Sequence, residues 1–161
     1  SMTEEATEEF LSVLRPYTML VVLDGKLGPF GGITFVEPGE LRKSIVLIDA
    51  EGDRYVPLAE GAVSADATNL AVMMKPLLSN MLGPTGENMG FFFLPATTEA
   101  GGLIADPLGE GTFTVRVGDQ PFEWRTPLSS AIPSKVCPVD GEEMSGAWSY
   151  CPWHGKKLGA K

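Results

Sequence analysis

Histidine and cysteine are scarce in this chain. Its 161 residues include one histidine, His154, and two cysteines, Cys137 and Cys151. A Ser–His–Asp or Cys–His catalytic arrangement would have to use His154. Cys151 lies three residues before it, a spacing typical of metal ligands, so metal binding explains both side chains better. The sequence also lacks phosphate-binding glycine loops, kinase motifs and zinc-protease helix motifs, which argues against an enzyme.

Basic residues are few as well. The chain has 12 Lys and Arg against 21 Asp and Glu, which gives a formal net charge of −9. Residues 1–134 carry −10 of this charge and residues 135–161 carry +1. Because an acidic surface repels phosphate groups, we expect neither general nucleic-acid binding nor attachment to an anionic membrane. Solubility explains the acidity, and an acidic docking face for a partner is the alternative.

Long apolar runs are missing too. No stretch approaches the roughly 20 apolar residues that a membrane-spanning helix needs. The first ten residues are acidic and lack the basic region and apolar core of a signal peptide. We therefore expect a cytoplasmic protein without a membrane partner. In that reducing compartment two cysteines more often bind a metal than form a disulfide.

Residues 2–134 are predicted to form an acidic α+β body with two helices. Thr3 is a suitable cap for the first helix, and Pro16 ends it. Asp66 is the predicted N-cap of the second, which Pro76 should kink or break. Apolar residues recur in the second helix at helical spacing, and we expect this stripe to pack on the core. Its members are Leu70, Met73, Met74, Leu77, Leu78 and Met81.

The same body contains several predicted strands. Residues 91–94 form a continuous apolar run that suits a strand covered on both faces. Residues 24–32 are glycine-rich and are interpreted as a turn, since they match no nucleotide-binding pattern. These elements predict a mainly antiparallel sheet with two packed helices. The other strands are predicted at 18–23, 33–36, 44–49, 54–57 and 112–117, with a return strand through Phe122 and Trp124 after a turn at Gly118-Asp119.

Residues 3–57 are weakly similar to the SseB-type N-terminal domain. The similarity consists of an acidic helix, a strand and a hairpin that ends in Arg54-Tyr55-Val56-Pro57-Leu58. The resemblance implies a fold for this part of the chain and no specific activity.

Residues 135–161 contain the one chemical signature in the sequence. The pattern C-P-V-D-G at 137–141 returns as C-P-W-H-G at 151–155. Two ligands separated by two residues can turn onto one ion, and the glycine that follows each pair permits a tight turn. A mixed set of thiolate, imidazole and carboxylate ligands suits zinc better than magnesium or calcium. We therefore predict one zinc ion held by Cys137, Asp140, Cys151 and His154.

This region resembles the zinc ribbon family, whose usual form is C-P-x-C-G, a spacer, and an aromatic residue before C-P-x-C-G-x-x-L. Val136–Gly141 and Tyr150–Leu158 carry the resemblance, with Asp140 and His154 where the family has cysteine. The resemblance implies a small zinc-ribbon-like β unit after the body. We expect Trp148, Tyr150 and Trp153 to form its miniature core, because so small a unit has few other residues to bury.

Four states of this region remain open from the sequence. A structural metal is the favoured one, followed by a metal-free ribbon and by a Cys137–Cys151 disulfide. The fourth is a catalytic metal whose open position holds water, with Glu142 and Glu143 as the nearby candidate bases.

The sequence favours a non-enzymatic protein-interaction module with a structural zinc site and a protein partner. A nucleic-acid-associated ribbon protein is one alternative, supported by Lys156, Lys157 and Lys161 near Trp153. A small metal-dependent hydrolase is the other.

Overall fold

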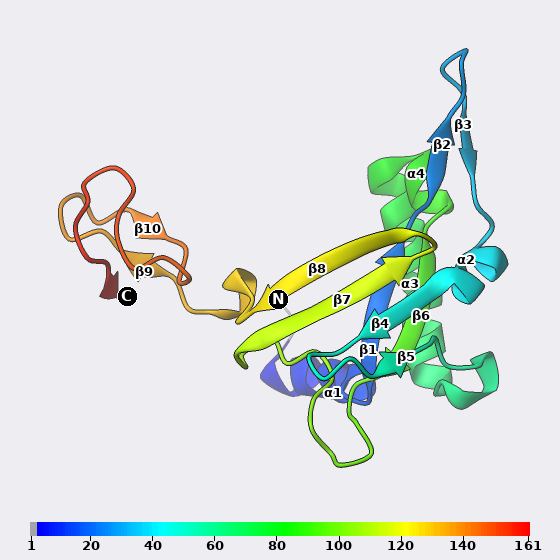
Figure 1. Cartoon of the computed structure of the whole chain (residues 1–161), viewed down its shortest axis with the longest axis horizontal. Helices are drawn as coiled ribbons and strands as arrows, with labels where there is room; N and C mark the ends of the chain where they lie inside the picture. Colours follow the sequence, from blue (N-terminus) through cyan, green and yellow to red (C-terminus); the bar gives the residue numbers. More distant parts are fainter. Residues whose placement is uncertain (1–2) are drawn as a thin grey trace.

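Two antiparallel sheets and two long helices make up most of the body. The computed structural model describes residues 3–161 and has an α+β architecture. The larger sheet has the strand order β5-β4-β7-β8, and the smaller pairs β1 with β6 (Figure 1). The bounds are β1 Tyr17–Val22, β4 Ile45–Ile48, β5 Arg54–Tyr55, β6 Gly90–Pro95, β7 Gly111–Val117, β8 Gln120–Thr126, α1 Glu4–Leu14 and α3 Ala65–Leu82.

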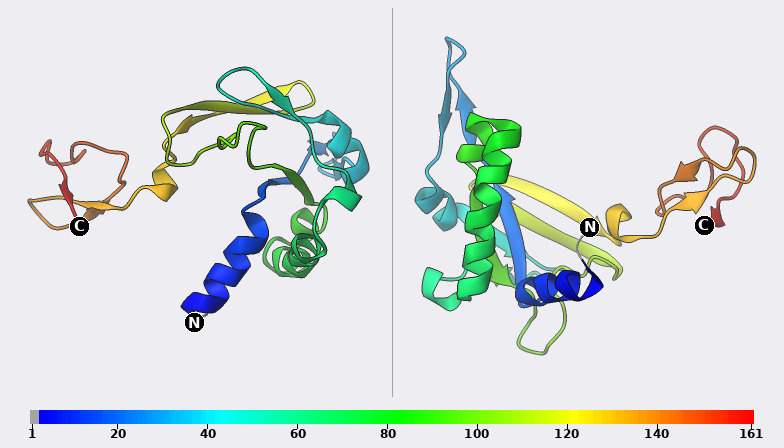
Figure 2. Two further views of the ribbon diagram at one scale, coloured as in Figure 1. Left: turned by 90° about the horizontal axis from the view of Figure 1, so that it is seen from below. Right: turned by 180° about the vertical axis from the view of Figure 1, so that it is seen from behind.

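Strand β6 lies in the middle layer, between the larger sheet and the helices (Figure 2). Phe92 and Leu94 pack toward the larger sheet, where Leu94 meets Leu47 in one buried cluster. Phe93 points the other way and packs on Ala67 and Ala71 of α3. This alternation confirms the prediction of a strand that is covered on both faces.

Helix α1 ends before Pro16 as predicted, and its Val13 and Leu14 pack near α3. Helix α3 differs from the prediction at its start, and Pro76 does not break it. Its N-cap is Ser64, whose side chain accepts a hydrogen bond from the Ala67 N–H, and the helix continues through Pro76 to Leu82. No helix over residues 3–161 is both long and apolar enough to cross a bilayer.

The apolar stripe of α3 packs only in part, because Leu70, Met74 and Leu78 are half-buried and the other three members are exposed. Met73, Leu77 and Met81 are 70%, 62% and 77% exposed, whereas Ala67 and Ala71 are buried. Apolar residues lie on several sides of this helix, so spacing alone did not identify the packed side. Ala67 and Ala71 form the buried face because their small side chains let the helix backbone approach the ring of Phe93 closely.

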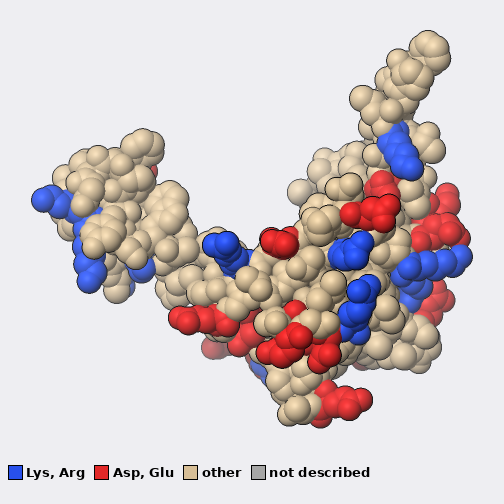
Figure 3. Space-filling model, viewed as in Figure 1, with Lys and Arg blue, Asp and Glu red and all other residues tan. Residues whose placement is uncertain are grey.

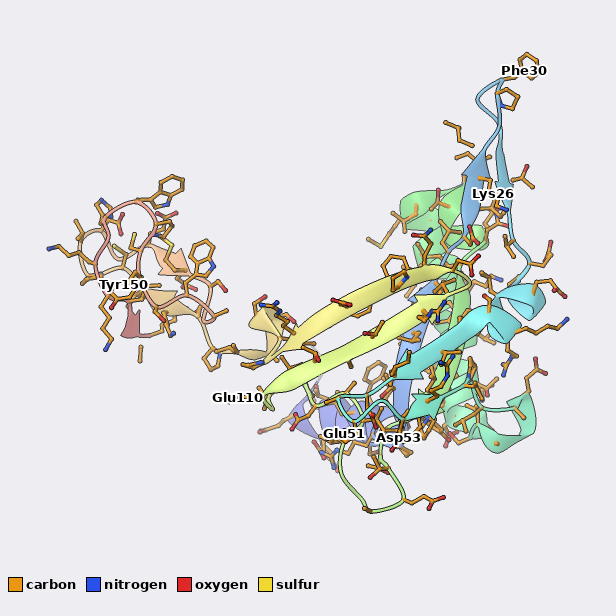
Figure 4. All side chains as sticks on the ribbon, viewed as in Figure 1. Lys26, Phe30, Glu51, Asp53, Glu110 and Tyr150 are labelled. Carbon is orange, nitrogen blue, oxygen red and sulfur yellow. The ribbon has the colours of Figure 1, made fainter. Side chains whose placement is uncertain are left out.

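The predicted glycine-rich turn is a projecting hairpin instead. It contains strand β2, Gly25–Leu27, which pairs with β3, Ile33–Phe35. Phe30 stands at its tip with its side chain fully exposed (Figure 4). Helices α2, Pro38–Ser44, and α4, Pro84–Glu87, were not predicted either. Both begin with proline, a residue that signals a turn but is equally suited to the first position of a helix.

Asp49 closes the turn between β4 and β5. Its buried carboxylate accepts hydrogen bonds from the N–H groups of Glu51 and Asp53 at 3.1 and 2.8 Å. The hydroxyl of Tyr55 donates to the other oxygen at 2.9 Å. Partial burial and this bond to Asp49 raise the pKa of Tyr55 to about 12. Gly52 has φ of +91°, so the predicted turn and its glycine are confirmed.

Replacing Asp49 should therefore destabilise the body. Asp49→Ala removes the acceptor of three donors in a buried position, and we expect a loss of about 2 kcal/mol in the free energy of unfolding. Urea denaturation measures this loss. Asp53→Ala is the matched control, because that side chain is exposed and makes none of these bonds. Equal effects of the two changes would contradict this role of Asp49.

Candidate metal site

The predicted ligands lie in a small C-terminal unit with its own sheet. Strand β9, Lys135–Val136, is paired on one side with β10, Glu143–Met144, and on the other with β11, Gly159–Ala160. The connection from β8 contains one short 3₁₀ turn, η2, Ser129–Ala131, and the unit stands apart from the two sheets of the body in Figure 1. The body has one comparable turn, η1, Glu60–Ala62.

The core of this unit consists of the two thiols and two apolar side chains. Cys137 and Cys151 are each 1% exposed, and Met144 and Leu158 pack with them. The sequence pattern includes Leu158, whereas Met144 was missed because nothing in its spacing relates it to the cysteines. So small a cluster buries little apolar surface, and an additional interaction is needed to stabilise such a unit.

The two knuckles, residues 137–142 and 151–156, have the same backbone hydrogen bonds. In each, the cysteine N–H donates to the carbonyl five residues later, at 3.0 and 2.8 Å respectively. The glycine N–H donates back to the cysteine carbonyl at 2.9 Å in both. Gly141 and Gly155 have φ of +74° and +60°, which a residue with a Cβ rarely adopts. The repeated sequence thus makes the same turn twice.

The imidazole of His154 lies close to both sulfur atoms. Its Nδ1 is 3.4 Å from the Sγ of Cys137 and 3.6 Å from the Sγ of Cys151. The three ligand atoms lie within 4.8 Å of one another, and both thiols are free. This Cys-Cys-His group is close enough to hold a metal ion.

Asp140 reaches the same place from the first knuckle. Its Oδ2 is 3.6 Å from Nδ1 of His154, while its Oδ1 accepts a hydrogen bond from the Glu142 N–H at 3.0 Å. That N–H, the Cys137 thiol and the imidazole of His154 lower the pKa of the Asp140 carboxyl below its ordinary value. The carboxylate is therefore ionised and oriented with one oxygen directed at the imidazole. The structure thus brings three of the four predicted residues into one group, and Asp140 lies next to that group through its contact with His154.

The two thiols have unequal surroundings. Burial raises the pKa of the Cys137 thiol above its ordinary value. Burial acts in the same direction on Cys151, but the N–H groups of His154 and Trp153 and the imidazole lower the pKa of Cys151 overall. These N–H groups are contacts that no sequence motif displays. They favour a thiolate, which is the form of cysteine that binds metal.

The two candidate bases of the sequence do not face the ligands as a catalytic pair. Glu143 accepts a hydrogen bond from Ser134 and forms an ion pair with Lys161. Lys161 holds the pKa of the Glu143 carboxyl below its usual range, which weakens it as a base. Glu142 is exposed and contributes its backbone to the first knuckle.

The three aromatic residues of the unit are not its core, contrary to the prediction. Trp148, Tyr150 and Trp153 are 47%, 61% and 73% exposed (Figure 4, Tyr150 labelled). The sulfur atoms, Met144 and Leu158 fill the interior in their place. The prediction was wrong because it considered only the aromatic side chains as core residues. The two thiols can be buried in the core as well.

Comparison of the chain with protein-family models, curated proteins and solved structures finds no match in any of the three.

The positive φ of Gly155 yields a prediction about the second knuckle. Gly155→Ala places a Cβ in the left-handed region, which costs about 1–2 kcal/mol. We expect the amide of Cys151, which donates to Lys156, to exchange its hydrogen roughly tenfold faster or more. Gly159→Ala is the control, since that glycine is exposed and also has open space around it. A Gly155→Ala protein with unchanged exchange would show that the turn is not strained.

Proposed function

We propose that the C-terminal unit binds one structural zinc ion through Cys137, Asp140, Cys151 and His154. The distances between ligand atoms carry this proposal. In a tetrahedral zinc site, Zn–S bonds near 2.3 Å and Zn–N bonds near 2.0 Å put sulfur and nitrogen about 3.6 Å apart. The two observed separations are 3.4 and 3.6 Å. A disulfide would instead need the two sulfur atoms about 2.05 Å apart, and both thiols are free.

Asp140 is the fourth ligand in this proposal. Its Oδ2 lies 3.6 Å from Nδ1 of His154, close to the separation of about 3.4 Å expected between nitrogen and oxygen ligands of one zinc ion. The three mutually close ligand atoms are those of Cys137, Cys151 and His154, so Asp140 would have to turn its carboxylate toward the ion to close the coordination sphere and leave no place for a reactive water. A closed site supports a structural ion over a hydrolase.

The biological role that we propose is protein interaction without catalysis. The unit exposes Trp148, Tyr150 and Trp153, and Val139 in the first knuckle is 56% exposed. Aromatic side chains with exposed faces are enriched where proteins bind one another. The zinc ion would fix the knuckles that carry Val139 and Trp153, so that this surface has one shape. The free thiols fit a reducing compartment such as the cytoplasm.

Metal analysis tests the zinc site. Protein purified without added metal should contain about one zinc per chain, as its four ligands require. Cys151→Ser should lose the ion and unfold the C-terminal unit, while the body keeps its structure. Elemental analysis and hydrogen exchange measure the two effects.

Asp140→Ala retains three ligands and should keep zinc with a lower affinity, which competition with a chelator measures. Ser149→Ala is the control, because that side chain is exposed and is none of the proposed ligands. Wild-type protein without bound zinc would refute the proposal.

A nucleic-acid-associated ribbon is the second candidate function. Lys135, Lys156, Lys157 and Lys161 give the C-terminal unit its basic character, and Figure 3 shows mainly basic charge on it. Exposed aromatic rings beside lysines are also a pattern that stacks on single-stranded bases. Against it stands the acidic body, with a formal charge of −10 over residues 1–134.

Retention on immobilised single-stranded RNA and DNA separates the two candidates. For a protein-interaction module we expect no retention at physiological salt, and the same result for Trp153→Ala. Retention that falls steeply with salt would favour the second candidate. In that case Trp153→Ala and Lys157→Ala should each weaken binding, and Lys26→Ala on the hairpin arm, as the control, should not.

A further inference from the structure

Strand β8 ends the larger sheet, and its outer edge is free. Among residues 3–161 no strand pairs with β8 except β7. Residues 120–125 are all exposed, including the rings of Phe122 and Trp124, which are 49% and 38% exposed. A long edge strand with open backbone groups is a template for pairing with another chain.

The register of the hairpin shows which backbone groups face outward. Val117 pairs with Gln120 across the two-residue turn. In such a hairpin the backbone N–H and carbonyl groups of these two flanking residues bond to each other. Hydrogen-bonding direction alternates along a strand, so the even-numbered residues of β8 face β7. The N–H of Gly118 donates to the carbonyl of Ser44, the residue directly before β4, which fits the same alternation in β7. The outward residues of β8 are therefore Pro121, Glu123 and Arg125.

We infer that β8 is a self-pairing edge that binds the β8 strand of a second copy of this chain in an antiparallel arrangement about a two-fold axis at Trp124. In this register Glu123 of one copy lies opposite Arg125 of the other, and the reverse pair is made by symmetry. Every outward N–H of the two strands then finds a carbonyl, since Pro121 has no N–H to offer. The two larger sheets join into one.

Charge complementarity selects the second copy as the partner. Glu123 and Arg125 are exposed, and neither forms an ion pair within residues 3–161. The register centred on Trp124 places these opposite charges next to each other twice. A register centred on Glu123 would place two carboxylates opposite each other, which is unfavourable. It would also leave the backbone carbonyl of Arg125 without a hydrogen-bond donor, because it would face Pro121, which has no N–H.

The proline residues and the aromatic rings fit the same register. Pro121 and Pro127 bracket the pairing segment, so the strand offers N–H groups only at Glu123 and Arg125 along its outer edge. On the opposite face Trp124, which stacks on Phe113 at 5.4 Å, meets Trp124 of the second copy. The two Trp124 residues form a pair without backbone hydrogen bonds between them, and side chains at such a pair lie close together. The half-exposed indoles would therefore shield each other from solvent.

Charge reversal in the full-length protein tests the pairing. Light scattering over a range of concentrations should show a reversible dimer for the wild type. Glu123→Lys and Arg125→Glu should each raise its dissociation constant by roughly tenfold or more, because each places like charges opposite one another twice. The double variant E123K/R125E restores opposite charges and should restore dimerisation. Glu99→Lys is the control, because it makes the same change of charge as Glu123→Lys at an exposed residue outside β8.

Cysteine cross-linking tests the register. Trp124→Cys should form a disulfide between copies under mild oxidation, whereas Phe122→Cys, which faces Thr126 of the second copy, should not. Native Cys137 and Cys151 are the same in both variants and in the wild type, which shows their background. A wild type that remains a single chain at every concentration would overturn the inference. So would a dimer that both charge reversals leave unchanged, or equal cross-linking through residues 122 and 124.

Discussion

The burial of β6 on both faces is the constraint on which the body depends. This one strand supplies Leu94, Phe92 and Phe93 to three separate buried clusters. Two of them connect it to the larger sheet and the third to α3. Since side chains of a strand alternate between its faces, a shift of one residue would exchange the two sets and empty all three clusters. The unbroken run of phenylalanines followed by leucine is thus what orders the sheets and helices into layers.

The C-terminal unit follows a different physical rule. Its interior holds two thiols, Met144 and Leu158, far less apolar surface than the body buries. Repeated turns place the sulfur atoms and the imidazole, and the carboxylate of Asp140 lies next to the imidazole. Polar ligands in so small an interior repel or compete for protons unless a cation joins them. The proposed ion would therefore hold this unit together, as the burial of strand β6 holds the layers of the body together.

Most of the body's strands and the group of Cys137, Cys151 and His154 could be predicted from the sequence, because local patterns encode them. Alternation identified β7, the apolar run identified β6, and the C-P-x-x-G repeat identified the knuckles. The errors arose where tertiary contacts decide between equal local choices. Spacing did not distinguish the faces of α3, where Ala67 and Ala71 rather than the methionine stripe meet Phe93. Nor did it show that Trp148 and Trp153 are left outside by the sulfur atoms.

The position of β9 between β10 and β11 has a practical consequence for how the C-terminal unit can be attached to other molecules. Its first strand, Lys135–Val136, lies next to its last, Gly159–Ala160, so the chain enters and leaves at the same side. A fluorescent protein, affinity tag or surface anchor fused after Lys161 would start beside the tether to the body. The knuckles and their exposed rings are built from the loops between these strands. They would stay accessible in such a fusion, which makes the carboxyl end the preferred handle for studying the unit.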